Sequence, residues 1–304
     1  MSTILLVEDS ATDRAMMCSL LQRGGYDVIA AANGCEAIDR MNAQRPDAIV
    51  TDLQMPEMDG EELVRRVVKA NPEIPVILAT AHGSESLAAD ALANGAVNFV
   101  PKASVATLLL TVVRRAIAIS NADQTYRNVP GRLRSPEFYF KLESRIAAIE
   151  PAARFLTEVM SASASMGPCD RMRIGTAVAS AIFNAICYGN LELTDEDERV
   201  ASLLVGDESS DRSLVNEFGG APHVKRAVRL KVSVGDADTR ISVSHEGDGP
   251  MVRTTPAPGT PASFQLEQCR GWLLITSFID EVILSTDRTE VVMVKRHSSA
   301  ESLG

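Results

Sequence analysis

Five polar residues, of types that together could handle a phosphoryl group, each follow a short apolar run in the first part of the sequence. They are Glu8 and Asp9 after the first run, Asp52 after the third, Thr80 after the fourth and Lys102 after the fifth. Neighbouring carboxylates repel one another unless a cation joins them, and their oxygens suit Mg²⁺. A carboxylate beside Mg²⁺ can attack a phosphoryl group, while the metal and an ammonium group neutralise the transferring oxygens. These residues indicate phosphoryl transfer to a carboxylate, provided that the fold brings them together.

The elements that must position these residues alternate along the first 120 residues. Apolar runs predict strands, and segments with helical periodicity predict the helices between them. The strands are expected at 3–7, 27–31, 47–51, 75–79 and 97–100, and the helices at 9–25, 34–43, 59–70, 84–93 and 104–119. This alternation predicts an α/β fold, a doubly wound five-stranded parallel sheet. The active cleft of such a sheet lies at the carboxyl ends of its strands, where the polar residues stand.

Four stretches of this half, LLVEDS, VTDLQMPEMDG, LATA and NFVPK, resemble the receiver domain of bacterial two-component response regulators. The resemblance implies that Asp52 accepts a phosphoryl group from a cognate histidine kinase or a phosphotransfer protein. It implies a Mg²⁺ site made by Glu8, Asp9 and Asp52 with the backbone carbonyl of Gln54. Lys102 would pair with the phosphoryl group. All of these residue types are present, so we expect a working phosphorylation site.

The same resemblance implies a switch pair, Thr80 and Phe99. The hydroxyl of Thr80 would move to the phosphoryl oxygen, and the ring of Phe99 would change rotamer. One departure from the family pattern is Ala103, because the family usually has Pro after the Lys. A cis peptide bond is therefore not expected after Lys102.

A polar stretch with two Pro and a Gly, residues 121–136, predicts a linker between a receiver domain (1–120) and a second domain (137–304). The second half predicts one strand, two helices, two strands, one helix and two strands. This order indicates an α+β two-layer domain. The apolar helix at 104–119 could pack on its own sheet or join two copies of the chain, and periodicity does not separate these readings. A homodimer therefore stays open.

Three stretches of the second half resemble the ATPase fold shared by histidine kinases, gyrase-type enzymes and anti-sigma-factor kinases, especially the last group. FNAICYGNLEL resembles the Asn-bearing helix, SVSHEGDGP the adenine loop and EQCRGWLLITSFIDEV the second glycine-rich loop. The resemblance implies that Asn184 holds the Mg²⁺ of bound ATP. The remaining nucleotide-site residues would be His245, Gly247, Gly249 and Gly271.

Three of the four expected elements of that ATP site are altered. Ser180 stands where the family has its acidic general base, and an alcohol cannot take a proton at neutral pH. His245 replaces the Asp that accepts a hydrogen bond from the adenine amine, and a neutral His accepts only in the right tautomer. Cys269 places a side chain where bare backbone should approach phosphate. We therefore predict a degenerate domain without catalysis, in which Asn184 could instead bond to backbone groups beside Gly189.

Weak ATP binding stays open at this stage, because Glu246 and Asp248 could replace the missing acid and Arg270 could meet a phosphate. The leading hypothesis is a response regulator whose receiver controls protein–protein contacts of the ATPase-like domain, with a sigma factor or an anti-anti-sigma protein among the candidate partners. The alternative is a phosphorylation-gated Ser/Thr kinase of the anti-sigma-factor type. A third reading makes the second half a dimerisation scaffold.

Charge and composition limit which partners and which cellular location the sequence predicts. The net charge is −10, with 10 basic against 15 acidic residues over 1–120 and 20 against 25 over the rest. Neither half has the basic excess that nucleic-acid binding needs, so no nucleic acid is expected as a partner. The sequence predicts no signal peptide and no membrane segment. Five Cys without a CxxC motif predict reduced thiols in a cytoplasmic protein.

Overall fold

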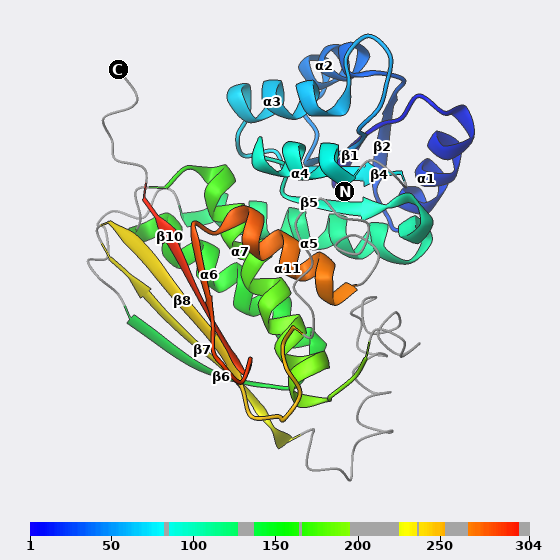
Figure 1. Cartoon of the computed structure of the whole chain (residues 1–304). Coiled ribbons are helices and arrows are strands. Elements are labelled where there is room, and N and C mark those ends of the chain that lie inside the picture. The colour runs from blue at the N-terminus through cyan, green and yellow to red at the C-terminus, as the bar shows by residue number, and fades with distance from the viewer. Residues whose placement is uncertain are drawn as a thin grey trace.

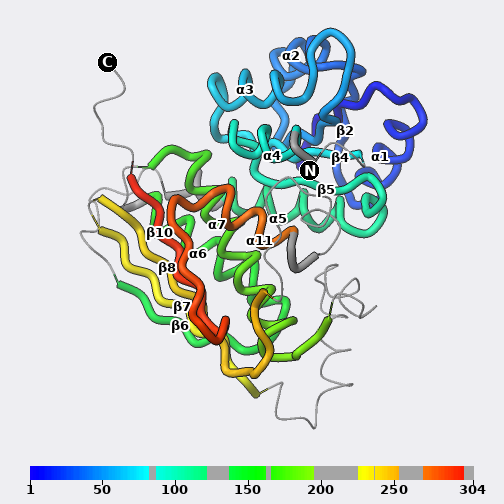
Figure 2. Tube along the Cα trace, viewed as in Figure 1, coloured from blue at the N-terminus to red at the C-terminus, as the bar shows by residue number. Residues whose placement is uncertain are grey.

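The chain forms two sheets, each with its own helices, and helices of both halves lie between the sheets (Figure 1). Figure 2 follows the same path as a tube. The computed structural model describes residues 1–81, 85–126, 137–163, 166–194, 225–235, 237–252 and 267–297. The side chains of 85–86, 122–126, 162–163 and 267–269 lie outside that description.

The first sheet has five parallel strands, as the sequence predicts, and their order is β2-β1-β3-β4-β5. The strands are β1 (Thr3–Val7), β2 (Asp27–Ala31), β3 (Ala48–Asp52), β4 (Val76–Thr80) and β5 (Asn98–Pro101). The helices are α1 (Ala11–Arg23), α2 (Gly34–Ala43), α3 (Gly60–Ala70), α4 (Glu85–Ala93) and α5 (Val105–Tyr126), with a short 3₁₀ turn, η1 (Lys102–Ser104). Every residue of β3 and β4 is buried, which explains their unbroken apolar runs.

Local sequence signals start the helices that follow the functional strand ends. The side chains of Ser10 and Asp59 accept hydrogen bonds from backbone N–H groups in the first turns of α1 and α3. A Cβ on Gly60 would collide with the carbonyl oxygen of Asp52, so only glycine allows α3 to start this close to β3. The strand end that carries Asp52 is thereby held against the next helix.

The second sheet has five antiparallel strands in the order β6-β7-β8-β10-β9. The strands are β6 (Glu137–Glu143), β7 (Ala227–Val234), β8 (Asp238–His245), β9 (Glu281–Leu284) and β10 (Glu290–Arg296). The helices are η2 (Ile146–Ala148), α6 (Ile149–Ser163), α7 (Pro168–Asn184), the π-helical turn η3 (Ala185–Asn190) and α11 (Glu267–Phe278). Burial alternates along β7 and β8, as in a sheet covered by helices on one face. The predicted α+β two-layer fold is confirmed.

Two boundaries differ from the expectation. Helix α5 continues to Tyr126, six residues into the stretch predicted as a linker, whereas residues 127–136 lie outside the described part of the chain. Helix α7, expected from the sequence to begin near Asp170, begins at Pro168 because proline suits the first helical position. The polar stretch after residue 194 is also outside the description. Every described peptide bond is trans, including the bond after Lys102.

The two halves share one buried apolar cluster. Helix α5 packs on its own sheet and also on α6 and α7, and α11 packs against α4. The prediction of no membrane segment did not account for the length and apolar character of α5. Residues 102–121 are long and apolar enough to cross a bilayer by length and composition, but over half of the stretch is buried inside the protein. The apolar surface of α5 is therefore used for contacts within the chain.

Candidate phosphoacceptor site and the Asn184 region

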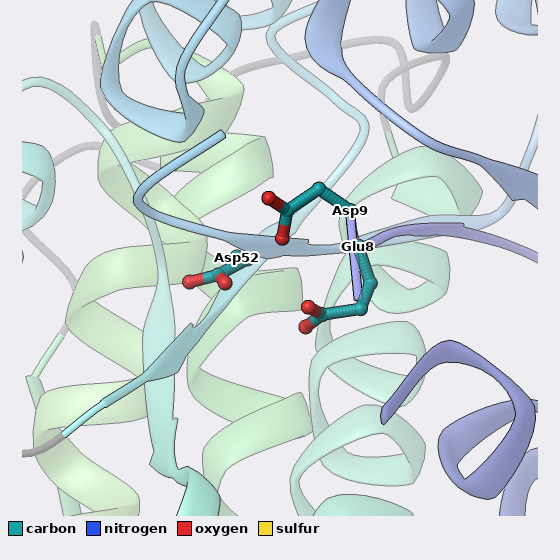
Figure 3. A group of neighbouring side chains, drawn as sticks. All are labelled: Glu8, Asp9 and Asp52. Atoms are coloured by element: carbon teal, nitrogen blue, oxygen red, sulfur yellow. The ribbon is translucent and has the colours of Figure 1, made fainter. Parts of the chain in front are cut away.

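Three carboxylates gather at the carboxyl ends of β1 and β3, as Figure 3 shows. One oxygen from each of Glu8, Asp9 and Asp52 lies within 4.8 Å of the other two. Glu8 is fully buried, Asp52 is 7% exposed and Asp9 is exposed. Carboxylate oxygens at this spacing, with one of them open to solvent, fit a hard divalent cation such as Mg²⁺.

Lys102 closes the cluster from the end of β5. Its Nζ lies 2.7 Å from Oδ2 of Asp52, 2.9 Å from Oε2 of Glu8 and 3.5 Å from Oδ2 of Asp13. Burial disfavours a charged Lys102, but its hydrogen bonds to Asp52 and Glu8 outweigh burial, and its pKa lies above the ordinary value. Burial raises the pKa of Glu8, and the bond to Lys102 only partly offsets that rise. One ammonium group among these acids leaves negative charge that a cation would neutralise.

The other oxygen of Asp52 is held by backbone. Its Oδ1 accepts hydrogen bonds from the N–H of Leu53 at 2.6 Å and of Gln54 at 3.4 Å. Gln54 is exposed beside the cluster, where the sequence places it, and its carbonyl as a metal ligand stays a prediction. These contacts fix the direction of the Asp52 carboxylate.

The predicted switch pair lies on the two strands beyond Asp52. Thr80 ends β4 and is 4% exposed, and Phe99 on the neighbouring β5 is fully buried. The predicted receiver residues therefore lie on or directly after four adjacent strands, and all but Phe99 stand at the carboxyl end of the sheet. The sequence did not single out Asp13, which joins the cluster through Lys102.

In the second half, two predicted nucleotide-site residues lie side by side. Asn184 ends α7 and is 1% exposed, and a Cβ on Gly271 of α11 would lie 3.3 Å from its Oδ1. Neither polar atom of the Asn184 side chain has a hydrogen-bond partner among the described residues. The alternative that Asn184 bonds to backbone near Gly189 is therefore wrong. Ser180, one turn earlier, donates to the carbonyl of Thr176 at 3.0 Å.

The other predicted nucleotide-site residues make close backbone contacts instead. A Cβ on Gly247 or Gly249 would collide with the carbonyl oxygens of Gly189 or Tyr188 in η3. Nδ1 of His245 accepts a hydrogen bond from the N–H of Gly247 at 3.2 Å. Because that bond assigns the proton of the neutral ring to Nε2, His245 cannot offer an acceptor there to an adenine amine. Burial also lowers the pKa of His245 and favours the neutral ring.

The residues considered as substitutes for the missing groups are engaged elsewhere. Glu246 accepts from the N–H of Ala227 at 2.8 Å and pairs with Arg229. Asp248 has a 93% exposed side chain and pairs with Arg226 at 3.6 Å. Arg270 donates to Oδ1 of Asn98 on β5, a contact across 172 residues of sequence that no local pattern signals.

Comparison with known proteins agrees with this division of the chain. Residues 4–114 match the response regulator receiver domain family, and residues 142–295, just over half of the chain, match the histidine kinase-like ATPase domain family.

Several relatives and solved structures match less than half of the chain. Chemotaxis protein CheY of Bacillus subtilis is 31% identical over 115 residues, which cover 38% of this chain and 96% of CheY. The luminescence regulatory protein LuxO of Vibrio campbellii is 34% identical over 126 residues, 41% of this chain and 28% of LuxO. The chain thus spans only about a third of the LuxO-type relatives or less. A receiver domain structure from Clostridium thermocellum matches with 28% identity and a TM-score of 0.37, covering 38% of this chain and 94% of that one.

The two family matches cover both described sheets, and the acidic cluster falls inside the first match. The chain belongs to the histidine kinase-like ATPase family through its second half and carries a response regulator receiver domain in its first half, which indicates a two-component response regulator.

Proposed function

We propose that the chain is switched by phosphorylation of Asp52 and signals through protein contacts of its ATPase-like domain. The observation that carries this proposal is the position of Asp52 between Lys102, at 2.7 Å, and the carboxylates of Glu8 and Asp9. An oxygen of Asp52 forms the new O–P bond as the N–P bond of a phosphohistidine, or the bond to another donor, breaks. Lys102 stays close to the oxygens that carry the transferred charge.

The cation site belongs to the same proposal. Glu8, Asp9 and Asp52, with the carbonyl of Gln54, would hold Mg²⁺, which when bound supplies positive charge for the phosphoryl oxygens. Backbone donors at Asp52 keep one oxygen fixed while the other faces Lys102. A water molecule that attacks phosphorus would break the O–P bond and return the carboxylate with release of inorganic phosphate.

The output is proposed to be protein binding, because three observations oppose ATP chemistry. The alcohol of Ser180 occupies the general-base position, and His245 lacks the acceptor that adenine needs. The cavity beside Asn184 has a volume of about 30 Å³, which suits about two water molecules. A sigma factor or an anti-anti-sigma protein stays the proposed class of partner, and the cytoplasm the proposed location.

A second candidate is a phosphorylation-gated nucleotide site of a Ser/Thr kinase. One observation favours it, namely that the buried amide of Asn184 has no partner within the described protein and is therefore suited to a ligand. Calorimetric titration with ATP and Mg²⁺, on phosphorylated and unphosphorylated protein, separates the two candidates. Binding that is lost in Asn184→Ala supports the kinase, and no binding in either state at millimolar ATP supports protein contacts.

The phosphorylation itself is tested by intact mass measurement after incubation with acetyl phosphate and Mg²⁺. We expect the mass of one phosphoryl group on the natural chain and none on Asp52→Asn. An exposed acid of α2, Asp39, offers the matched control, because Asp39→Asn should leave the reaction unchanged. Phosphorylation that persists in Asp52→Asn would refute the assignment.

A further inference from the structure

The receiver domain packs against the part of the second domain that contains Asn184. This contact, called the interdomain contact, joins α4, β5 and α5 of the first half to α6, α7 and α11 of the second. Figure 1 shows α5, α7 and α11 running between the two sheets. Leu108 and Val112 of α5 line the same small cavity as Asn184 and Gly271. A ligand of nucleotide size, or a partner side chain, cannot reach Asn184 while α5 lies there.

Arg270 connects this contact to the switch residue. Its guanidinium donates to Oδ1 of Asn98 at 3.1 Å and lies over the ring of Phe99, 5.5 Å from the ring centroid. Oδ1 of Asn98 also accepts the backbone N–H of Phe99 at 2.8 Å. Arg270 is 5% exposed, so this contact is desolvated, and cation–π attraction is strongest when water is excluded. A new rotamer of Phe99 would therefore change the surface on which Arg270 rests.

Two further contacts join α7 to the end of α4 and the turn after it. Arg173 donates to the carbonyl of Leu92 at 2.9 Å, and the thiol of Cys169 donates to the carbonyl of Gly95 at 3.4 Å. Arg173 also donates to the carbonyl of Ser277 on α11 at 3.2 Å. The contact is thus anchored by polar bonds at the end of α4, at the turn after it and at the first residue of β5, the strand that carries Phe99.

The state of Asn184 indicates that the covered surface has a use of its own. A buried amide without hydrogen bonds destabilises the fold, and an apolar residue would avoid that cost. The neighbouring Asn190 is equally buried yet bonds to both Ser144 and Glu246. Of these two buried asparagines, Asn184 is therefore the one whose side-chain oxygen and nitrogen are available to bind a ligand.

We propose that the interdomain contact is inhibitory: the unphosphorylated receiver covers the Asn184 surface, and Arg270 couples its release to the rotamer of Phe99. This inference rests on the proposed phosphorylation of Asp52 and adds its consequence for the second domain. Phosphorylation that draws Thr80 toward Asp52 and turns Phe99 removes the support for Arg270. The receiver then loosens from α7 and α11, and Asn184 becomes accessible.

A native thiol reports this opening in the full chain. Cys169 is half-buried at the interdomain contact, where burial raises the pKa of its thiol to about 11 from an ordinary 9.0. Release would increase its thiolate fraction, and hence its reaction with N-ethylmaleimide, by up to about 100-fold. Cys18 on α1 is half-buried outside the contact, and Cys187 is buried in the second domain's core. Labelling of these two thiols controls for general loosening and for unfolding.

The experiment measures labelling at each thiol by peptide mass spectrometry, with and without Mg²⁺ and beryllofluoride, a mimic of the acyl phosphate. We expect beryllofluoride to accelerate labelling of Cys169 at least 5-fold while Cys18 and Cys187 stay unchanged. Arg270→Ala should label fast at Cys169 without beryllofluoride, Arg270→Lys should be intermediate, and Arg240→Ala on the exposed surface of β8 should behave as the natural chain.

The outcomes distinguish the two proposals. If acetyl phosphate modifies Asp52 but Cys169 labels at the same rate with and without beryllofluoride, the inhibitory contact is refuted and the phosphorylation stands. If Asp52 is not modified, the proposed function fails. The role of Arg270 is tested independently of that result, and it is refuted if Cys169 of Arg270→Ala labels as slowly as Cys169 of the natural chain. If Cys187 also becomes reactive in Arg270→Ala, the variant has unfolded. The effect of beryllofluoride on Cys169 labelling in the natural chain then decides whether the contact is inhibitory.

Discussion

Asn184 and Asn190, two buried asparagines in one short region, should respond in opposite directions to the same substitution. Leucine has the branching of asparagine at Cγ, so Asn→Leu exchanges the two polar atoms for methyl groups with little change of shape. Asn184 is 1% exposed and makes no hydrogen bond within the described protein. Asn190 is fully buried and is bonded through both of its polar atoms.

The magnitudes follow from those bonds. An unsatisfied buried polar group costs about 1–3 kcal/mol, so Asn184→Leu should raise the free energy of unfolding of the second domain by about that amount. Asn190→Leu leaves the N–H of Glu246 without its acceptor and removes the donor to Ser144, so it should lower the free energy of unfolding by about 2–4 kcal/mol. In a domain of this size each kcal/mol shifts the melting temperature by about 2–4 °C.

Trp272 provides the assay, because it is the only tryptophan of the chain and lies on α11, next to Gly271. Its fluorescence in urea reports unfolding of the second domain, and phosphodonor-free buffer keeps the receiver in one state. A destabilised Asn184→Leu would refute the reasoning, because it would mean that the amide makes bonds that hold the fold, either to protein groups or to water in the adjoining cavity. Equal effects at both positions would refute it too.

Three further predictions concern the two sites. Mg²⁺ at 100 times its dissociation constant should stabilise the receiver by about 2.7 kcal/mol, and Asp9→Asn should abolish that gain, as melting curves with and without the metal would show. Lys102→Ala should slow phosphorylation of Asp52 by about 100-fold while stabilisation by Mg²⁺ persists, and unchanged rates would contradict the contact at 2.7 Å. Burial lowers the pKa of folded His245 below its ordinary 6.5, so the unfolded chain binds the proton first. The contribution of His245 to stability is thus present above about pH 6.5 and is lost as the pH falls through the folded pKa, and His245→Gln should flatten the decline of melting temperature below that pH.

The first sheet and its site could be predicted from the sequence because their signals are local. A buried parallel strand needs an unbroken apolar run, and the residue after each run must stand at the same edge of the sheet. Glu8, Asp52, Thr80 and Lys102 follow from that rule without knowledge of any distance. The end of α5 did not follow, because a helix can continue through a polar segment once its first turns are packed.

In the second half, the sequence pattern did not predict the contacts that the candidate site residues make. The adenine-loop glycines Gly247 and Gly249 are present in the sequence, but the structure uses them to let the loop touch η3. The tautomer of His245 depends on a single hydrogen bond from Gly247, which spacing does not reveal. The partner of Arg270 is 172 residues away, and periodicity carries no information on contacts between domains.

Arg270 connects the loop that resembles a nucleotide-binding loop to the receiver domain. It occupies the variable position of a loop whose backbone, in the resembling family, approaches phosphate, and here its guanidinium lies on Asn98 and Phe99. A side chain committed to the receiver cannot at the same time bind a nucleotide phosphate. If the proposed inhibitory contact holds, any ligand of Asn184 that needs Arg270 must compete with it, and by linkage that ligand also favours the receiver state in which Phe99 has turned. Phosphorylation and ligand binding in the second domain are then two inputs to one equilibrium.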